Sequence, residues 1–400
     1  MIRLQLTRKD PLKVFSALAA ALVLLAVSAC EHPVGLFASL EEEIPIDEDR
    51  GVPTDDYMRT MLISDDGEYY FAEFTSLYVR RRAEDLDLTG EPNRSWTRIG
   101  KPTAAGEHDT LGSIAEYAAD DELWAIYGGE LYARPNDGGE TGRGEWSERS
   151  RPEDSSRASR LFTVNSKLFL STRLSGGGYA LYRRDATDWD RLGFDGVDDD
   201  SVNQINAIVE FDNAYYVATQ SRIYLTADLD NDDFQPADDG LPTSANYREL
   251  EVGELEGTPA LFAAGNKHVS VTTDGTNWSS SDSQSHDGED VQFTALGWYV
   301  TENGTGYLVA GTEKSGLYEA PDGDLDRLRR QGSGTDLFGR KGNFLTTRLS
   351  GGAVHRIFVD ENGRSWRSQN KPHIFVGAPG RGLWRGEHDE EYDALTWRRE

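Results

Sequence analysis

Most of this chain is a repeated unit, and the repeat limits the possible folds more than any other feature of the sequence. From residue 57 onward, a short apolar segment is followed by an apolar–aromatic pair, a polar turn and usually a tryptophan. Eight units can be counted, and in one of them the pair is the weaker Val269-Ser270. The other pairs are Leu77-Tyr78, Leu131-Tyr132, Leu181-Tyr182, Ile223-Tyr224, Leu317-Tyr318, Ile357-Phe358 and Leu383-Trp384. The units close on Trp96, Trp146, Trp189, Phe234, Trp278, Leu325, Trp366 and Trp397.

Some units match one another closely along their length. The segment LYRRDATDWDRL (181–192) aligns with LYEAPDGDLDRL (317–328), and FLSTRLSGG (169–177) aligns with FLTTRLSGG (344–352). A third pair is YLVAGTEKSGLYEA (307–320) with IFVGAPGRGLWRG (374–386). Three matches in register indicate a true internal repeat.

The units predict an all-β fold. Segments such as EYYFAEF and KLFLSTR are short, rich in β-branched and aromatic residues, and separated by Gly, Asn and Asp. A period of roughly 40–50 residues with about four short strands is typical of a β-propeller blade. We therefore expect four-stranded antiparallel blades packed in a ring. The unit count predicts eight blades, and seven is the alternative if the last two units share one blade.

Closure of this ring depends on the last unit. Only a short stretch separates Trp366 from Ile374, which leaves too little chain for an innermost strand and its turns. A strand from residues 34–46 is therefore expected to complete the last blade. We assign residues 57–400 to the propeller domain.

The N-terminal segment predicts export and a lipid anchor. A basic stretch is followed by the apolar run VFSALAAALVLLAV and by Ser28 and Ala29, immediately before Cys30, the one cysteine of the chain. The run is shorter than the about 20 residues that span a bilayer, and fits a signal peptide over residues 1–29. Val27-Ser28-Ala29-Cys30 resembles the bacterial lipobox, which implies lipidation of Cys30. The alternative is an ordinary cleavage site with Cys30 incidental.

The sequence after this cysteine predicts which membrane holds the protein and predicts a linker to the propeller. Glu31 replaces the aspartate associated with inner-membrane retention in such lipoproteins, which favours the outer membrane. Residues 30–56 include EEEIPIDEDRGVPTDD (41–56), an acidic, proline-containing stretch that reads as an extended linker. The expected membrane association is through the lipid alone.

Two segments resemble the Asp-box (BNR-like) repeat of sialidase-type propellers. VDENGRSW (359–366) matches at Gly363 and Trp366, has Ser365 for a threonine, and has Glu361 where the aspartate belongs. VTTDGTNW (271–278) supplies Asp274 and Trp278 but is one residue short. The resemblance implies a structural hairpin, in which the acid caps turn amides and the tryptophan packs between blades, and it implies no catalytic role for these residues.

The motifs of catalysis are missing from the sequence. A sialidase carries an early Arg-Ile-Pro, and the nearest segment here, HRIFVD (355–360), lies near the wrong end and lacks the proline. Neither G-x-S-x-G nor H-E-x-x-H occurs. We expect no catalytic residue and no cofactor.

Two acidic clusters contain residue types that can ligate a metal ion. Asp228, Asp230, Asp232 and Asp239 fall at positions 1, 3, 5 and 12 of a calcium-loop register, but Asp233 replaces the glycine of position 6. We expect an acidic hairpin turn there. His388, between Glu387 and Asp389-Glu390, is expected in a solvated surface loop.

The net charge of the chain excludes one class of partner. The formal net charge is −29, and a strongly acidic chain repels nucleic acid. With no catalytic constellation, we expect a monomeric, lipid-anchored scaffold or binding protein whose partner is another protein of the cell envelope. The alternatives are a glycan-binding lectin and a sialidase-like glycoside hydrolase; three converging arginines beside a Tyr–Glu pair would favour the hydrolase.

Overall fold

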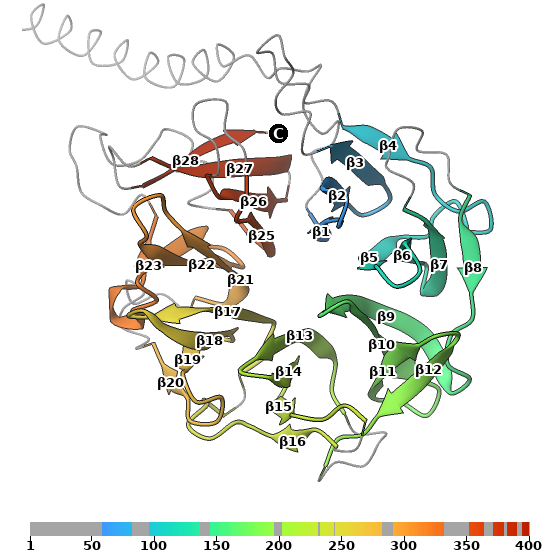
Figure 1. Cartoon of the computed structure of the whole chain (residues 1–400), viewed down its shortest axis with the longest axis horizontal. Coiled ribbons are helices and arrows are strands. Elements are labelled where there is room, and N and C mark those ends of the chain that lie inside the picture. The colour runs from blue at the N-terminus through green and yellow to red at the C-terminus, as the bar shows by residue number, and fades with distance from the viewer. Residues whose placement is uncertain are drawn as a thin grey trace, which may run out of the picture. The chain divides into compact units, whose positions relative to one another are not determined.

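The structure is a computed structural model. It describes residues 58–81, 96–136, 145–195, 202–230, 233–243, 245–281, 291–331, 352–363, 371–379, 382–389 and 394–399. Within these residues the chain forms seven antiparallel sheets of four strands each, arranged in sequence around a central axis (Figure 1). The protein is therefore a β-propeller, and we number its blades 1 to 7.

Blades 1 to 4 follow one another along the chain. Blade 1 contains β1 (Thr60–Ile63), β2 (Glu68–Ala72), β3 (Leu77–Arg81) and β4 (Thr97–Ile99). Blade 2 contains β5 (Leu111–Tyr117), β6 (Glu122–Tyr127), β7 (Glu130–Pro135) and β8 (Ser147–Arg149). Blade 3 contains β9 (Ser155–Val164), β10 (Lys167–Leu174), β11 (Tyr179–Asp185) and β12 (Asp188–Leu192). Blade 4 contains β13 (Ile205–Phe211), β14 (Ala214–Thr219), β15 (Ile223–Thr226) and β16 (Gln235–Pro236).

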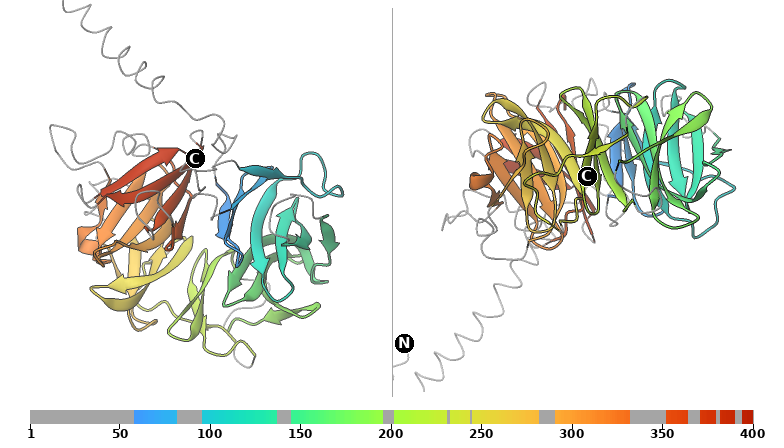
Figure 2. Two further views of the ribbon diagram at one scale, coloured as in Figure 1. Left: turned by 45° about the horizontal axis from the view of Figure 1, so that its top comes forward. Right: turned by 90° about the horizontal axis from the view of Figure 1, so that it is seen from below.

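Blades 5 to 7 complete the ring. Blade 5 contains β17 (Glu249–Leu255), β18 (Thr258–Ala264), β19 (Val269–Thr272) and β20 (Ser279–Ser280). Blade 6 contains β21 (Phe293–Val300), β22 (Gly306–Thr312), β23 (Leu317–Pro321), the 3-10 helix η4 (Leu325–Arg327) and β24 (Arg329–Arg330). Blade 7 contains β25 (Arg356–Asp360), β26 (His373–Ala378), β27 (Gly382–Asp389) and β28 (Ala394–Arg399). In every blade the first strand is innermost, and the side view shows the blades standing along the axis (Figures 1 and 2).

The apolar–aromatic pair lies on the third strand of every blade. Leu77-Tyr78 is on β3 and Leu383-Trp384 is on β27, and the pairs between them occupy β7, β11, β15, β19 and β23. Ile357-Phe358 is the exception, because it lies on β25, the first strand of blade 7. The expectation of eight blades is therefore wrong and the alternative of seven is confirmed: the last two units are the inner and outer halves of one blade.

This assignment also removes the difficulty at Trp366. The innermost strand of blade 7 precedes Trp366 in the sequence, so the short stretch before Ile374 does not have to contain it. Blade 7 has four strands drawn entirely from residues 356–399. The predicted closing segment, residues 34–46, lies outside the described residues.

Burial between neighbouring blades holds the ring together. The buried apolar residues form seven clusters, and each cluster joins two adjacent blades. The last cluster closes the ring, since it places Met58, Tyr69 and Phe71 of blade 1 against Phe375 and Leu383 of blade 7.

A polar contact supports the same closure. The Tyr69 hydroxyl donates to Oδ2 of Asp360 at 2.5 Å, and both side chains are almost fully buried. The first and last blades are thus joined by side-chain packing and by a hydrogen bond to a buried carboxylate.

Candidate functional site

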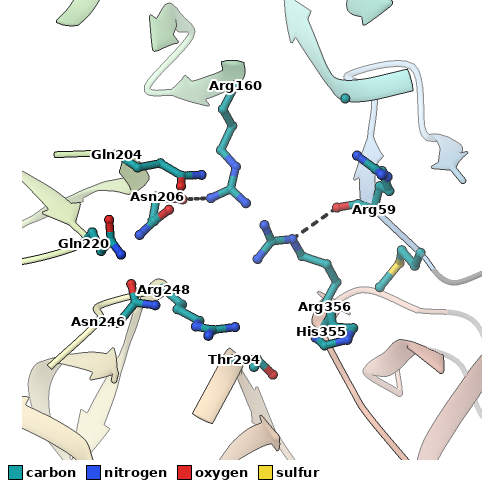
Figure 3. Close-up of a pocket in the computed structure, with 12 residues that line it drawn as sticks. Arg59, Arg160, Gln204, Asn206, Gln220, Asn246, Arg248, Thr294, His355 and Arg356 are labelled. Atoms are coloured by element: carbon teal, nitrogen blue, oxygen red, sulfur yellow. Dashed lines mark hydrogen bonds between the residues drawn. The ribbon is translucent and has the colours of Figure 1, made fainter. Parts of the chain in front are cut away.

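A cavity of about 410 Å³ lies on the axis, at the end where the innermost strands begin. Polar side chains dominate its wall, and Figure 3 shows Arg160, Arg248 and Arg356 reaching toward its centre from different blades. The polar lining residues are Arg59, Arg160, Gln204, Asn206, Gln220, Asn246, Arg248, Thr294, His355 and Arg356. This cavity, called the axial cavity below, is the candidate functional site.

Strand geometry brings the four arginines together. Arg59 immediately precedes β1, Arg248 immediately precedes β17, and Arg356 is the first residue of β25. Arg160 extends from the middle of β9. Because each innermost strand starts at the same end of the ring, residues of blades 1, 3, 5 and 7 meet at the axis although they are far apart in the sequence.

Hydrogen bonds to the backbone orient two of these arginines. Nε of Arg356 donates to the carbonyl oxygen of Arg59 at 3.1 Å, which links blade 7 to blade 1. Nη1 of Arg160 donates to the carbonyl oxygen of Asn206, which links blade 3 to blade 4. The Asn206 side chain donates in turn to the carbonyl oxygen of Tyr247 at 2.7 Å. The wall of the cavity is thus fixed across blade boundaries.

The carboxylates near the axis leave part of this positive charge without a partner. Arg356 pairs with Oε2 of Glu249 at 2.8 Å. Within the described residues, Arg160 and Arg248 form no ion pair, and Nε of Arg248 is buried without a hydrogen-bond partner. Outer arginines behave differently: Arg191 pairs with Asp154 at 3.2 Å. In a chain with 70 acidic and 41 basic residues, this arrangement favours an anionic ligand.

Burial and neighbouring charge shift several ionisable groups at this site. Burial lowers the pKa of the Arg160 guanidinium, and the charge of Glu249 opposes that change. Burial, followed by the charge of Arg248, lowers the pKa of His355, which favours the neutral imidazole. Burial raises the pKa of Glu249 to about 7, against the charge of Arg160. These shifts follow from charged groups held partly away from water.

The cavity wall lacks an acid–base pair. No tyrosine and no carboxylate occurs among its described lining residues. The described part of the chain also contains no cluster of three His, Cys, Asp or Glu side chains able to hold a metal ion. The arrangement can bind and orient an anion through guanidinium and amide groups.

The first Asp-box-like segment forms a capped turn between β19 and β20. Oδ1 of Asp274 accepts the backbone N–H groups of Thr276 at 2.9 Å and Asn277 at 2.8 Å, and these bonds hold the pKa of Asp274 well below its usual range. Nε1 of Trp278 donates to the carbonyl oxygen of Ala237 at 2.8 Å, and its ring packs between blades 4 and 5. Both residues lie away from the axial cavity.

The second segment is built differently. It starts in the first strand of blade 7, and the carboxylate that accepts a turn amide is that of Asp360, which bonds the N–H of Asn362 at 3.0 Å. Glu361, for which the sequence predicts the capping role, is exposed. Gly363 is required by space, because an added Cβ would lie 2.5 Å from the His373 ring. Ser365 and Trp366 lie outside the described residues.

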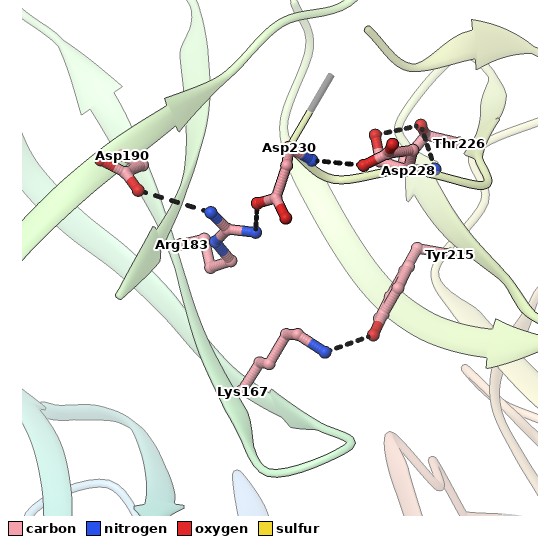
Figure 4. Close-up of polar contacts among 7 residues, drawn as sticks. All are labelled: Lys167, Arg183, Asp190, Tyr215, Thr226, Asp228 and Asp230. Carbon is pink, nitrogen blue, oxygen red and sulfur yellow. Dashed lines mark hydrogen bonds and ion pairs between the residues drawn. The ribbon is translucent and has the colours of Figure 1, made fainter. Parts of the chain in front are cut away.

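The predicted acidic turn lies between the third and fourth strands of blade 4. Asp230 pairs with Arg183 of blade 3 at 2.5 Å, and its backbone N–H donates to Asp228 at 2.9 Å (Figure 4). Nearby, Lys167 donates to the Tyr215 hydroxyl at 2.9 Å, again from blade 3 to blade 4. Asp232 lies outside the described residues. Of the described acidic side chains of this turn, Asp230 thus contributes to a contact between blades 3 and 4.

His388 does not lie in a solvated loop, and that prediction is wrong. It is in β27, with 5% of its surface exposed, and its Nδ1 lies 3.3 Å from the Tyr299 hydroxyl. Its ring also packs against Tyr307 of blade 6. The acidic residues around His388 are typical of a surface loop, which is why the sequence predicts one. In the strand, alternation of side chains between the two faces turns the histidine inward.

The N-terminal predictions cannot be placed on this structure. The signal peptide, Cys30, Glu31 and the tether over residues 30–56 lie outside the described residues. In the part that is described, no helix has the length and apolar character needed to cross a bilayer.

Comparison with known proteins gives the fold alone. No protein-family model and no curated protein matches this sequence. The extracellular domain of BT4673 from B. thetaiotaomicron is 14% identical, with a TM-score of 0.55 over 82% of this chain and 38% of that chain. YCF48 bound to D1 peptide is 13% identical, with a TM-score of 0.54 over 83% of this chain and 93% of that chain. The chain thus spans less than half of the BT4673 chain and nearly all of YCF48.

The functional residues that the sequence analysis missed are the axial arginines. HRIFVD, which does not fit the sialidase Arg-Ile-Pro, nevertheless places Arg356 in the cavity. The position of three of them in the sequence could have indicated the site, because Arg59, Arg248 and Arg356 each stand at the beginning of an innermost strand. This position can be recognised only after the first strand of every blade has been identified.

Proposed function

We propose that this propeller is a non-enzymatic binding domain that holds a carboxylate-bearing segment of a partner protein in the axial cavity. One observation carries the proposal: four arginines line a cavity whose described wall contains no carboxylate, and two of them, Arg160 and Arg248, have no ion-pair partner in the described chain. An acidic side chain or a chain terminus would supply the missing negative charge through charge-assisted hydrogen bonds.

Size and net charge favour a short acidic segment over a long polyanion. A cavity of about 410 Å³ admits a few side chains, and the net charge of −29 repels an extended nucleic acid. The likeness to YCF48, whose structure contains D1 peptide, supports a peptide as the kind of ligand that such a ring can accept.

An acidic sugar is the second candidate ligand. Converging arginines also suit the carboxylate of a sugar acid, and they meet half of the condition for a sialidase-like site. The other half, a Tyr–Glu pair, is missing from the described lining residues. Binding without hydrolysis is therefore the form of this alternative that the chemistry of the wall favours.

Calorimetric titration separates these possibilities. The purified propeller is titrated with a short glutamate peptide, with a sialic acid glycoside and with an uncharged glutamine peptide. The glutamate peptide is expected to bind, and Arg160→Gln or Arg248→Gln to weaken it about tenfold or more, since a charge-assisted hydrogen bond contributes roughly 1.5–3 kcal/mol. Arg327→Gln, at an outer ion pair with Asp322, is the matched control. Equal binding of both peptides, or tighter binding of the glycoside, contradicts the proposal.

The proposed location is the cell envelope, with Cys30 carrying the lipid. The basic stretch, the apolar run and the lipobox-like residues before Cys30 support this part. Labelling of cells with a radioactive fatty acid tests it: wild-type protein is expected to take up label, and Cys30→Ser to take up none. Equal labelling of the two, or no labelling of either, removes the anchor while leaving the binding proposal intact.

A further inference from the structure

Two further cavities adjoin the axial cavity on the side of blade 3. The first has a volume of about 310 Å³ and shares Arg59, Gly112, Arg160 and Gln204 with the axial cavity. The second has a volume of about 490 Å³ and shares Arg173, Tyr179 and Gln204 with the first. The three spaces adjoin one another at these shared residues, and we call the two outer ones together the blade 3 groove.

We infer that the anion site continues along the blade 3 groove, so that the ligand is an extended acidic peptide with carboxylates spaced along it. This inference rests on the proposed function, because it extends the same site from the axis outward. The additional carboxylates would meet Arg157 and Arg173. These two arginines line the groove and not the axial cavity.

The placement of Arg157 and Arg173 carries the inference. The two residues are direct partners in the antiparallel ladder of β9 and β10, and both side chains are exposed. Like charges directly opposite each other destabilise a sheet. Neither arginine forms an ion pair within the described residues. An anion bound between them would offset their repulsion.

Backbone features fix these two side chains toward the groove. The β9–β10 register shifts between Ser171 and Thr172 and again between Arg173 and Leu174, and such irregularities re-aim the side chains beside them. Gly129 has a φ of +98°, and an added Cβ would lie 2.4 Å from Cγ of Arg157. The aliphatic part of Arg157 therefore rests directly on the backbone of blade 2, which limits the positions open to its guanidinium.

Amide groups along the path favour a peptide over other polyanions. Gln204 and Gln220 line both the axial cavity and the outer part of the groove, and Asn203 joins them there. A carboxamide both donates and accepts hydrogen bonds, as does a peptide backbone. A polyphosphate offers hydrogen-bond acceptors only, so the carbonyl oxygens of these amides would find no donor on it.

The test compares two ligand lengths. Fluorescence anisotropy is measured with labelled peptides of two and of six glutamates, against wild type, the double variant Arg157→Gln/Arg173→Gln, the axial variant Arg248→Gln and the control Arg327→Gln. Circular dichroism and thermal melting verify that each variant is folded. A polyphosphate of equal charge and an acidic oligosaccharide are measured in the same way.

We expect wild type to bind the long peptide about tenfold or more tightly than the short one. The double variant is expected to lose this gain and to bind the short peptide as wild type does, whereas Arg248→Gln weakens both. Equal affinities for the two lengths in wild type, or a gain that survives the double variant, overturn the groove and leave the axial site standing. Tighter binding of either other polyanion overturns the peptide as occupant. Absence of binding by both peptides removes the proposed function itself.

Discussion

At the scale of single residues, the surroundings of the arginines differ. Arg149 meets Glu122 and Arg327 meets Asp322 in outer ion pairs. Arg160 and Arg248, at the axis, form no ion pair in the described part of the chain. Acidic residues outnumber basic ones 70 to 41, and two arginines of one cavity that still lack an ion pair are the reason why we propose an external anion as the ligand.

Trp278 is expected to stabilise the contact between blades 4 and 5. Replacing it by alanine should lower the free energy of unfolding by ~3–5 kcal/mol, because a large buried ring is lost and a cavity is left. Trp278→Phe keeps most of the packing and loses the hydrogen bond to Ala237, so a loss of about 1–2 kcal/mol is expected. Urea denaturation measures both. Trp189→Ala, at a half-buried tryptophan, should have the smaller effect, and an equal effect would contradict this account.

Glu251 is expected to make stability depend on pH. Burial, and then the charge of Glu249, raises the pKa of Glu251 to about 8, against about 4.3 for a glutamate in an unfolded chain. The folded state therefore holds a proton that the unfolded state releases, and stability from this group falls as pH rises from 4.3 through 8.

The variant Glu251→Gln removes this dependence and keeps an acceptor for the N–H of Trp298, which lies 3.1 Å from the carboxylate. Its melting temperature should be close to that of wild type at pH 5 and higher than wild type at pH 8.5. Glu153→Gln, at an exposed position, is the control. A difference between Glu251→Gln and wild type that is the same at both pH values would count against a raised pKa.

At the scale of secondary-structure elements, the sequence predicts the strands of a blade better than the number of blades. The third strand carries an apolar–aromatic pair in most blades and buries it against neighbouring blades, so that pair is visible in the sequence. The same residue pattern occurs on β25, which is a first strand. Because the local pattern does not distinguish a first strand from a third, the pattern on β25 predicts a blade of its own, and the unit count exceeds the number of blades by one.

The candidate site was beyond the reach of sequence reasoning for a related reason. Its arginines come from four blades, and their meeting depends on ring closure and on where each innermost strand begins. The capped turn at Asp274, in contrast, lies within a few consecutive residues, and its geometry follows from local hydrogen bonding.

Close approach of two innermost strands, β17 and β21, depends on a glycine. An added Cβ at Gly253 of β17 would lie 2.5 Å from the Trp298 ring of β21. Gly253→Ala should therefore displace that ring and lower the free energy of unfolding by about 1–3 kcal/mol. Gly100→Ala, where no atom lies within 4 Å of the added Cβ, is the matched control and should change little. Similar unfolding free energies for the two variants would show that β17 and β21 are not packed as described.

At the scale of the propeller, different parts of the seven blades stabilise the ring and line the axial cavity. Seven apolar clusters join neighbouring blades, while the ends of the innermost strands are left to line the axis with polar groups. The net charge of the chain is −29, whereas the described wall of the axial cavity carries four arginines and no carboxylate. This contrast favours a ligand whose negative charges lie at the axis and along the blade 3 groove.

A crystal structure of the propeller with a bound six-glutamate peptide tests the central claim most directly. The account predicts seven blades, with a peptide carboxylate about 2.7–2.9 Å from a guanidinium nitrogen of Arg160 or Arg248. A peptide bound only at the outer edges of the blades, with no carboxylate against either arginine, would contradict it.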